Sequence, residues 1–230
     1  MLSETTAPAV VRLPYEEAKA AMGWKQGEHI TIIGPTGQGK TTLALDLMNE
    51  RSYPLIIATK PKDTTLTNFI RRNNYHVIKE WPPVRERTVL WPSIRRVEDK
   101  PNQAVQVYRA LSEAYTAGGY AILVDELSYV LDELGCEQPV KTIWQQGRSI
   151  NLSLVTCILR PSHVPLLAYD QATFVILFRD NDERNLRRMG GLAHWSSKEI
   201  MSAVSRLNRH EFIILNTREG TMIQSKMENI

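Results

Sequence analysis

The chain has 230 residues, of which 43% are hydrophobic and 23% are charged, and its formal net charge at pH 7 is +3. This length is enough for one domain with a sizeable core and short for two, so we expect residues 1–230 to form a single domain. The small net charge does not indicate nucleic-acid binding unless basic residues cluster locally.

Cysteine content and hydropathy indicate the cellular compartment in which the protein is expected. The two cysteines, Cys136 and Cys157, have neither the spacing of metal ligands nor the density of a disulfide scaffold, which favours a reducing, cytoplasmic environment. No apolar stretch approaches the length that spans a bilayer, and the N-terminus lacks the basic start and apolar run of a signal peptide. We therefore expect no membrane insertion, and a loose leader over residues 1–11.

The first regular elements surround a glycine-rich turn. Residues 14–22 are expected to form a short helix that Gly23 ends. Residues 29–33 (HITII) read as an apolar strand, and residues 42–48 (TLALDLM) as a helix with an apolar face. Between them the sequence fits G-x-x-x-x-G-K-[ST], the pattern of a phosphate-binding loop, with Gly34, Pro35, Thr36, Gly37, Gln38, Gly39, Lys40 and Thr41, followed by Thr42.

Each part of this loop has a role in binding a nucleoside triphosphate. Glycines let the backbone approach an anion, and successive N–H groups then point at phosphate oxygens above the positive end of the following helix. Lys40 would reach the β- and γ-phosphates, and Thr41 would ligate Mg²⁺. The sequence therefore predicts a site for ATP and Mg²⁺ formed by residues 34–42.

Apolar runs alternate with amphipathic segments along the rest of the chain. Strands are expected at residues 53–58, 75–79, 88–91, 120–124, 152–159 and 173–178, and a terminal hairpin at 211–215 and 221–225. Helices are expected after Asp63, at 101–117, 139–149 and 164–168, and after a capping box that begins at Ser196. In the helix at 101–117, large apolar residues recur at helical spacing: Val105, Tyr108, Leu111 and Tyr115.

Strands that alternate with helices predict an α/β fold, a mostly parallel central sheet flanked by helices on both faces. The proline- and arginine-rich segment 82–100, which contains the short strand at 88–91, is expected to be a surface excursion. In parallel sheets ligands bind at the carboxyl ends of the strands. The phosphate loop, Lys60 and Lys62, Asp125 and Glu126, and Arg160 all follow expected strands, which predicts one active site at that edge.

An acidic pair closes the strand at 120–124. Asp125 would hold Mg²⁺ through Thr41 or water, and Glu126 would polarise the attacking water. Because side chains alternate along a strand, we expect the two carboxylates to point to opposite faces. A strand and a helix lie between the phosphate-loop strand and this strand, the order of the additional-strand, catalytic-glutamate (RecA-like) P-loop NTPases. This order favours a motor-type or switch-type ATPase over a nucleotide kinase.

A more specific resemblance to a known family lies in residues 147–162 (GRSINLSLVTCILRPS). They resemble the FtsK–HerA superfamily of DNA-translocating ATPases, in which an arginine-bearing helix precedes a strand that ends in a polar residue and Arg-Pro-Ser. Lys60-Pro61-Lys62 resembles the family's Asp-Pro-Lys, so the similarity covers roughly residues 28–180. Two residues depart from the family. Leu159 stands where the family has a glutamine that senses the γ-phosphate, and Lys60 replaces an acid; the sensor has either moved to Thr156 or been lost.

The resemblance implies a homo-oligomeric ring, usually a hexamer, in which a neighbour's arginine completes each site. Arg148 is then the first candidate for the arginine finger, with Arg160 or Arg179 as alternatives. The compact chain is most similar to the small genome-packaging ATPases of tailless internal-membrane viruses. That similarity implies double-stranded DNA as substrate, a capsid or portal component as docking partner, and a location in the host cytoplasm or the virion.

Several basic groups are candidates for DNA contact, and two other functions stay open. The groups are Lys60 and Lys62, the arginines from Arg85 to Arg96, and Arg184, Arg187 and Arg188. One alternative is a conjugation or chromosome-processing translocase of the same superfamily. The other is a nucleotide-dependent assembly or switch protein that moves no DNA, an alternative to which Leu159 gives weight.

Overall fold

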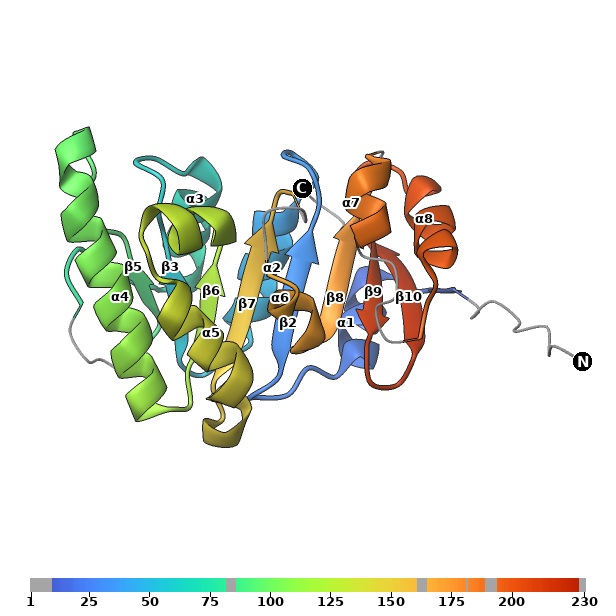
Figure 1. The fold of residues 1–230 in the computed structure, drawn as a ribbon, viewed down its shortest axis with the longest axis horizontal. Coiled ribbons are helices and arrows are strands. Elements are labelled where there is room, and N and C mark those ends of the chain that lie inside the picture. The colour runs from blue at the N-terminus through green and yellow to red at the C-terminus, as the bar shows by residue number, and fades with distance from the viewer. Residues whose placement is uncertain (1–9, 82–85, 161–164, 181, 189–193, 228–230) are drawn as a thin grey trace, which may run out of the picture.

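In the computed structural model, residues 10–81, 86–160, 165–180, 182–188 and 194–227 are described (Figure 1). Within these ranges ten strands form one sheet. They are β1 (Val11–Arg12), β2 (His29–Ile33), β3 (Pro54–Ile57), β4 (His76–Ile78), β5 (Thr88–Leu90), β6 (Ala121–Val124), β7 (Ser153–Ile158), β8 (Ala172–Phe178), β9 (Glu211–Asn216) and β10 (Thr221–Lys226).

The strand order is β1-β10-β9-β8-β2-β7-β6-β3-β5-β4. Neighbouring strands are parallel except in the pairs β8–β9 and β9–β10, which are antiparallel. The α/β class with a mostly parallel sheet is therefore confirmed. One strand, β7, separates β2 from β6 in the sheet. It comes later in the chain than β6, whereas β3, which lies between β2 and β6 in sequence, pairs on the far side of β6.

Helices cover both faces of this sheet. They are α1 (Tyr15–Met22), α2 (Lys40–Asn49), α3 (Thr64–Asn73), α4 (Lys100–Ala117), α5 (Glu137–Gln146), α6 (Leu167–Asp170), α7 (Glu183–Arg188) and α8 (Ser197–Ser205), with the short turns η1 (Val97–Asp99), η2 (Tyr129–Glu133) and η3 (Gly147–Ile150). One apolar core joins the sheet to α4, α5, α6 and α8, and a second joins the other face to α1, α2 and α3 (Figure 1). No helix in the described part of the chain is both long and apolar enough to cross a membrane.

The face that α4 buries differs from the apolar stripe seen in its sequence. Val105 and Tyr108 are 60% and 47% exposed, whereas Gln103 is fully buried. The Gln103 amide donates to the backbone oxygen of Thr59 at 3.0 Å and accepts from the Tyr129 hydroxyl at 3.0 Å. A polar residue is tolerated there because both ends of its amide are paired. The remaining buried residues are Val107, Ala110, Leu111 and Ala114.

Smaller differences concern segment ends. A loose leader was expected over residues 1–11, but Val11 belongs to β1 and pairs with Ile223 of β10. Residues 1–9 lie outside the described ranges. The strand expected at 88–91 is present as β5 and is buried, whereas Arg95 and Arg96 in the segment after it are exposed; residues 82–85 are outside the description. The helix expected at 164–168 begins at Leu167, and residue 164 is not described. The sequence did not predict α7 or the π-helical turn η2.

A neutral histidine is built into the start of β2. His29 is 3% exposed, and its Nδ1 accepts the backbone N–H of Leu154 at 3.0 Å. The neutral ring therefore carries its proton on Nε2. Burial lowers the pKa of His29 from 6.5 to about 4. In the unfolded chain the ring binds a proton below its ordinary pKa, while in the folded chain it stays neutral down to about pH 4, so stability falls as the pH drops through this range.

We expect the free energy of unfolding to fall by about 2 kcal/mol between pH 7 and pH 5 because of His29 alone. In His29→Asn, whose side-chain oxygen can still accept the Leu154 N–H, this part of the pH dependence should disappear. Urea denaturation at several pH values measures it, with the exposed His76→Asn as control. An equally steep fall in wild type and His29→Asn would contradict the assignment.

Candidate active site

The phosphate loop leaves β2 at Ile33 and enters α2 at Lys40. Gly34 is held between the neighbouring strands: its N–H donates to the Ile158 carbonyl at 3.1 Å, and a Cβ added to it would lie 2.6 Å from the Phe178 Cβ. Gly39, with φ of 107°, precedes the helix and has no side chain to occupy the N–H groups of its first turn. The loop therefore presents the positive end of α2 to an anion.

A cleft of about 560 Å³ opens above this loop. It brings together most of the predicted nucleotide-binding residues with the acidic pair that follows β6. The predicted residues that line it are Thr36, Gly37, Gly39, Lys40, Thr41, Thr42, Asp125 and Glu126. Lys60, which the sequence placed at this edge, also lines the cleft. The sequence did not predict that Thr65, Ser128 and Tyr129 line it as well.

The other three predicted loop residues support the cleft instead of lining it. Gly34 is buried at the base of the loop, and the Pro35 carbonyl accepts a hydrogen bond from the Lys40 Nζ at 2.9 Å. The Gln38 carbonyl lies 3.1 Å from the Nδ1 of His210. An ammonium group has three N–H donors, so Lys40 keeps two for phosphate oxygens while bonded to Pro35. Burial lowers the pKa of Lys40 from its ordinary value.

The predicted metal ligands are in contact. The Thr41 hydroxyl donates to Asp125 Oδ1 at 2.7 Å. A hydroxyl and a carboxylate are oxygen ligands of the kind that Mg²⁺ prefers. No group of three histidine, cysteine or acidic side chains in the described ranges is arranged to hold a metal by itself. The donors therefore fit a Mg²⁺ that takes its remaining ligands from phosphates and water.

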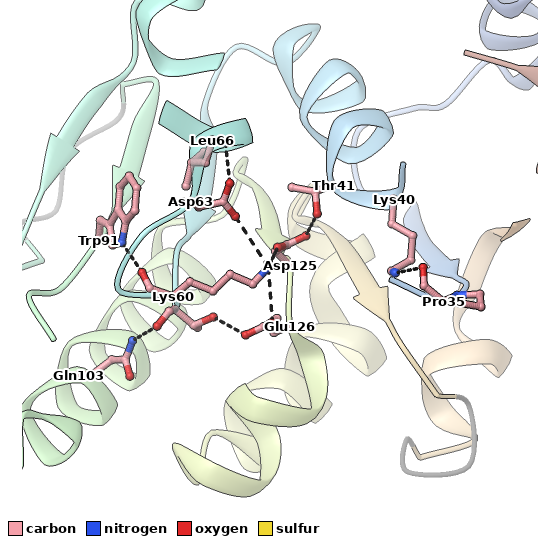
Figure 2. Close-up of polar contacts among 11 residues, drawn as sticks. Pro35, Lys40, Thr41, Lys60, Asp63, Leu66, Trp91, Gln103, Asp125 and Glu126 are labelled. Atoms are coloured by element: carbon pink, nitrogen blue, oxygen red, sulfur yellow. Dashed lines mark hydrogen bonds and ion pairs between the residues drawn. The ribbon is translucent and has the colours of Figure 1, made fainter. Parts of the chain in front are cut away.

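Asp125 and Glu126 do not point to opposite faces, which corrects the expectation from strand alternation. Both carboxylates approach the ammonium group of Lys60, with Nζ–O distances of 3.0 Å to Asp125 and 3.5 Å to Glu126 (Figure 2). β6 ends at Val124, so the alternation that holds inside a strand no longer governs the two following residues. The Thr59 hydroxyl donates to the other Glu126 oxygen at 3.2 Å.

The candidate arginines lie at both ends of the parallel strands. Arg160 and Arg179 follow β7 and β8 directly, at the same edge as the phosphate loop, and both are exposed. Arg148 lies in η3, before β7, at the opposite edge, where it lines a separate cavity of about 460 Å³. Because β7 spans roughly 20 Å, Arg148 cannot reach the phosphate loop of its own chain.

Leu159, which occupies the expected sensor position, and Thr156, the alternative sensor, lie in different surroundings. Leu159 is 47% exposed and lines the cleft. Thr156 is fully buried within the sheet, and its hydroxyl lies 3.3 Å from that of Thr31. Thr156 therefore does not reach the cleft, and the wall where the family has glutamine is apolar.

Most candidates for DNA contact are exposed, but two are half-buried: carboxylates surround Lys60, and the Arg87 guanidinium donates to the side chain and carbonyl of Asn49 at 2.6 and 2.9 Å. Arg187 pairs with Glu183 at 3.2 Å. Arg85 and the side chain of Arg188 lie outside the described part of the chain. The exposed candidates are Lys62, Arg95, Arg96, Arg184 and Arg187.

Comparison with solved structures finds this fold in a viral protein. The genome packaging NTPase B204 from Sulfolobus turreted icosahedral virus 2, in complex with sulfate, matches with a TM-score of 0.62 and 14% identity over 87% of this chain and 97% of B204. The DNA-packaging ATPase B204 from Sulfolobus turreted icosahedral virus matches with a TM-score of 0.63 and 16% identity over 90% and 100% of the two chains. This chain has the fold of a genome-packaging NTPase.

The same fold occurs in a conjugation protein. The monomer form of the pCW3 conjugation coupling protein TcpA, bound to ATPγS, matches with a TM-score of 0.52 and 13% identity over 86% of this chain and 59% of TcpA. No protein-family model matches the sequence, and no curated protein is significantly similar to it. The expected structural likeness to packaging and conjugation ATPases is thus confirmed at the level of the fold.

We expect Gly34→Ala to lower the free energy of unfolding by about 2 to 3 kcal/mol, because the new Cβ meets the Phe178 Cβ, an atom that cannot swing away. Gly135→Ala is the control: Gly135 has a φ of +64° and no atom within 4 Å of an added Cβ, so only backbone strain of about 1 kcal/mol is expected. Urea denaturation of both variants measures the difference. Equal losses would show that the loop does not need this close approach.

Proposed function

We propose that this protein is an ATP-hydrolysing DNA translocase whose task is viral genome packaging. The observation that carries the proposal is the cleft where the phosphate loop meets the Thr41–Asp125 hydrogen bond and Glu126. These groups serve binding, metal coordination and water activation in the order that phosphoryl transfer requires. The fold shared with a genome packaging NTPase supports the DNA part of the proposal.

The chain's own residues divide the reaction between them. Backbone N–H groups of the loop and Lys40 bind the phosphates, and Thr41 with Asp125 would hold Mg²⁺. When bound, the metal neutralises charge on the phosphate oxygens. Glu126 accepts a hydrogen bond from the attacking water, orients it toward the γ-phosphate and takes its proton.

The proposed translocase acts as a homo-oligomeric ring, a hexamer by resemblance, in which neighbouring chains complete each other's sites. Arg148 lies at the far end of the strands from its own phosphate loop, so it would act only on a nucleotide bound by a neighbouring chain. Arg160 and Arg179 lie at the loop edge and are the alternatives. A guanidinium at the γ-phosphate neutralises the charge that develops during hydrolysis.

Double-stranded DNA is the proposed substrate, and a capsid or portal component is the proposed docking partner. The exposed basic side chains suited to phosphate contact are those of Lys62, Arg95, Arg96, Arg184 and Arg187. The proposed place of action is the host cytoplasm or the virion.

Two specific observations favour other tasks. The structural match to a conjugation coupling protein favours a translocase that acts in DNA transfer between cells. A nucleotide-dependent switch that turns over slowly is favoured by two features of the cleft. Its wall is apolar at Leu159, and the carboxylates of Asp125 and Glu126 both pair with Lys60. Steady-state turnover separates the switch from either translocase.

Two substitutions test the nucleotide site. Lys40→Ala is expected to abolish binding of Mg·ATP, because the ammonium group bonded to the phosphates is lost. Glu126→Gln should bind Mg·ATP as wild type does but hydrolyse it at least about 100-fold more slowly, because an amide cannot take the proton of water. Calorimetry and phosphate release measure the two effects, with the exposed Lys62→Ala as control. If Lys40→Ala bound Mg·ATP like wild type, the proposed site would be wrong.

Adding linear double-stranded DNA is expected to raise the rate of ATP hydrolysis. Because phosphate contacts release counterions, this stimulation should weaken steeply between about 50 and 200 mM salt. Phosphate-release assays across that range measure it, and single-stranded DNA of equal length is the control. A slow rate that no DNA changes would overturn the translocase and leave the switch.

A further inference from the structure

The ammonium group of Lys60 is surrounded by carboxylates inside the cleft. Its Nζ lies 3.0 Å from Asp125, 3.5 Å from Glu126 and 3.7 Å from Asp63 (Figure 2). The Lys60 side chain is 38% exposed and the Asp125 side chain 13% exposed, so the pair is partly shielded from water. Lys60 is thus a counter-cation of both the metal-binding and the water-activating carboxylate.

The backbone around Lys60 is held in place by several hydrogen bonds. The Trp91 indole N–H donates to the Lys60 carbonyl at 2.7 Å, and Gln103 donates to the preceding carbonyl of Thr59 at 3.0 Å. Asp63 accepts the Leu66 N–H at 2.8 Å with one oxygen, as the N-cap of α3, while its other oxygen faces Lys60. The main chain therefore stays fixed, and only the flexible side chain of Lys60 can leave.

The contacts of Lys60 use the oxygens that the reaction needs. One oxygen of Asp125 is bonded to Thr41 and the other to Lys60. One oxygen of Glu126 is bonded to Thr59 and the other faces Lys60. Although burial opposes it, the neighbouring carboxylates raise the pKa of Lys60, so the group stays charged. An ammonium ion held on these carboxylate oxygens repels a Mg²⁺ that approaches them, because both groups are cations.

We propose that Lys60 is a positioning residue that keeps Asp125 and Glu126 inactive in the nucleotide-free protein, and that Mg²⁺ arriving with a nucleotide must displace it. The inference rests on the proposed function, since it needs the cleft to bind a magnesium–nucleotide complex. A lysine is suited to this position because it stabilises two adjacent carboxylates while no metal is present. Binding of metal and release of Lys60 are then one coupled event.

The test measures how much Mg²⁺ the protein needs to bind a fluorescent ADP analogue. Lys60→Met removes the competing charge and keeps the chain length, so the Mg²⁺ midpoint of binding is expected to fall about tenfold, the effect of losing one partly buried ion pair. Lys60→Arg keeps the charge and should give a midpoint near that of wild type. Lys25→Met, a change of an exposed lysine outside the cleft, is the matched control.

A second variant guards against misfolding, because Lys60→Met leaves three carboxylates close together. The double change Lys60→Met with Asp63→Asn removes one of these charges and keeps an N-cap for α3, and it should show the same lowered midpoint. An unchanged midpoint in the folded variants would overturn the role of Lys60. If wild type bound no nucleotide at any Mg²⁺ concentration, the proposed function itself would fail instead.

Discussion

The hydrogen bond between Thr41 and Asp125 is the contact on which the cleft depends. It joins the start of α2 to the end of β6 across the intervening strand β7, so it forms only when the three strands β2, β7 and β6 are parallel and in register. Parallel pairing brings the carboxyl ends of the strands to one edge. Every group that the reaction requires is delivered to this edge by a different segment of the chain.

Local patterns were enough to predict the phosphate loop, the acidic pair and most of the strands. These features depend on the order of residues within a few positions, and the loop in particular needs glycines at fixed spacing. The capping box at Ser196 was predicted for the same reason, and both of its hydrogen bonds are present. Features that depend only on residues a few positions apart could therefore be predicted from the sequence.

The features that were missed depend on pairing between distant segments. The sequence placed Lys60 at the edge of the sheet that carries Asp125 and Glu126, but it did not predict their contact, which depends on the pairing of β3 with β6. Gln103 is buried because Thr59 and Tyr129 satisfy its amide, so the apolar stripe of α4 was a poor guide to its packing. The fold itself does not choose among tasks, since packaging and conjugation proteins share it. The task of the protein therefore has to be inferred from the side chains in the cleft.

The first strand has a practical consequence for how the molecule can be handled. Because β1 pairs with β10, both ends of the described chain leave the sheet at one margin, with β9 and β8 between β10 and the phosphate-loop strand. Because β10 is parallel to β2, it ends at the edge that carries the phosphate loop, whereas the chain enters β1 at the opposite edge. A fluorophore or affinity handle attached ahead of β1 therefore stands clear of the cleft, and in the proposed ring it would report the spacing of neighbouring chains without obstructing nucleotide entry.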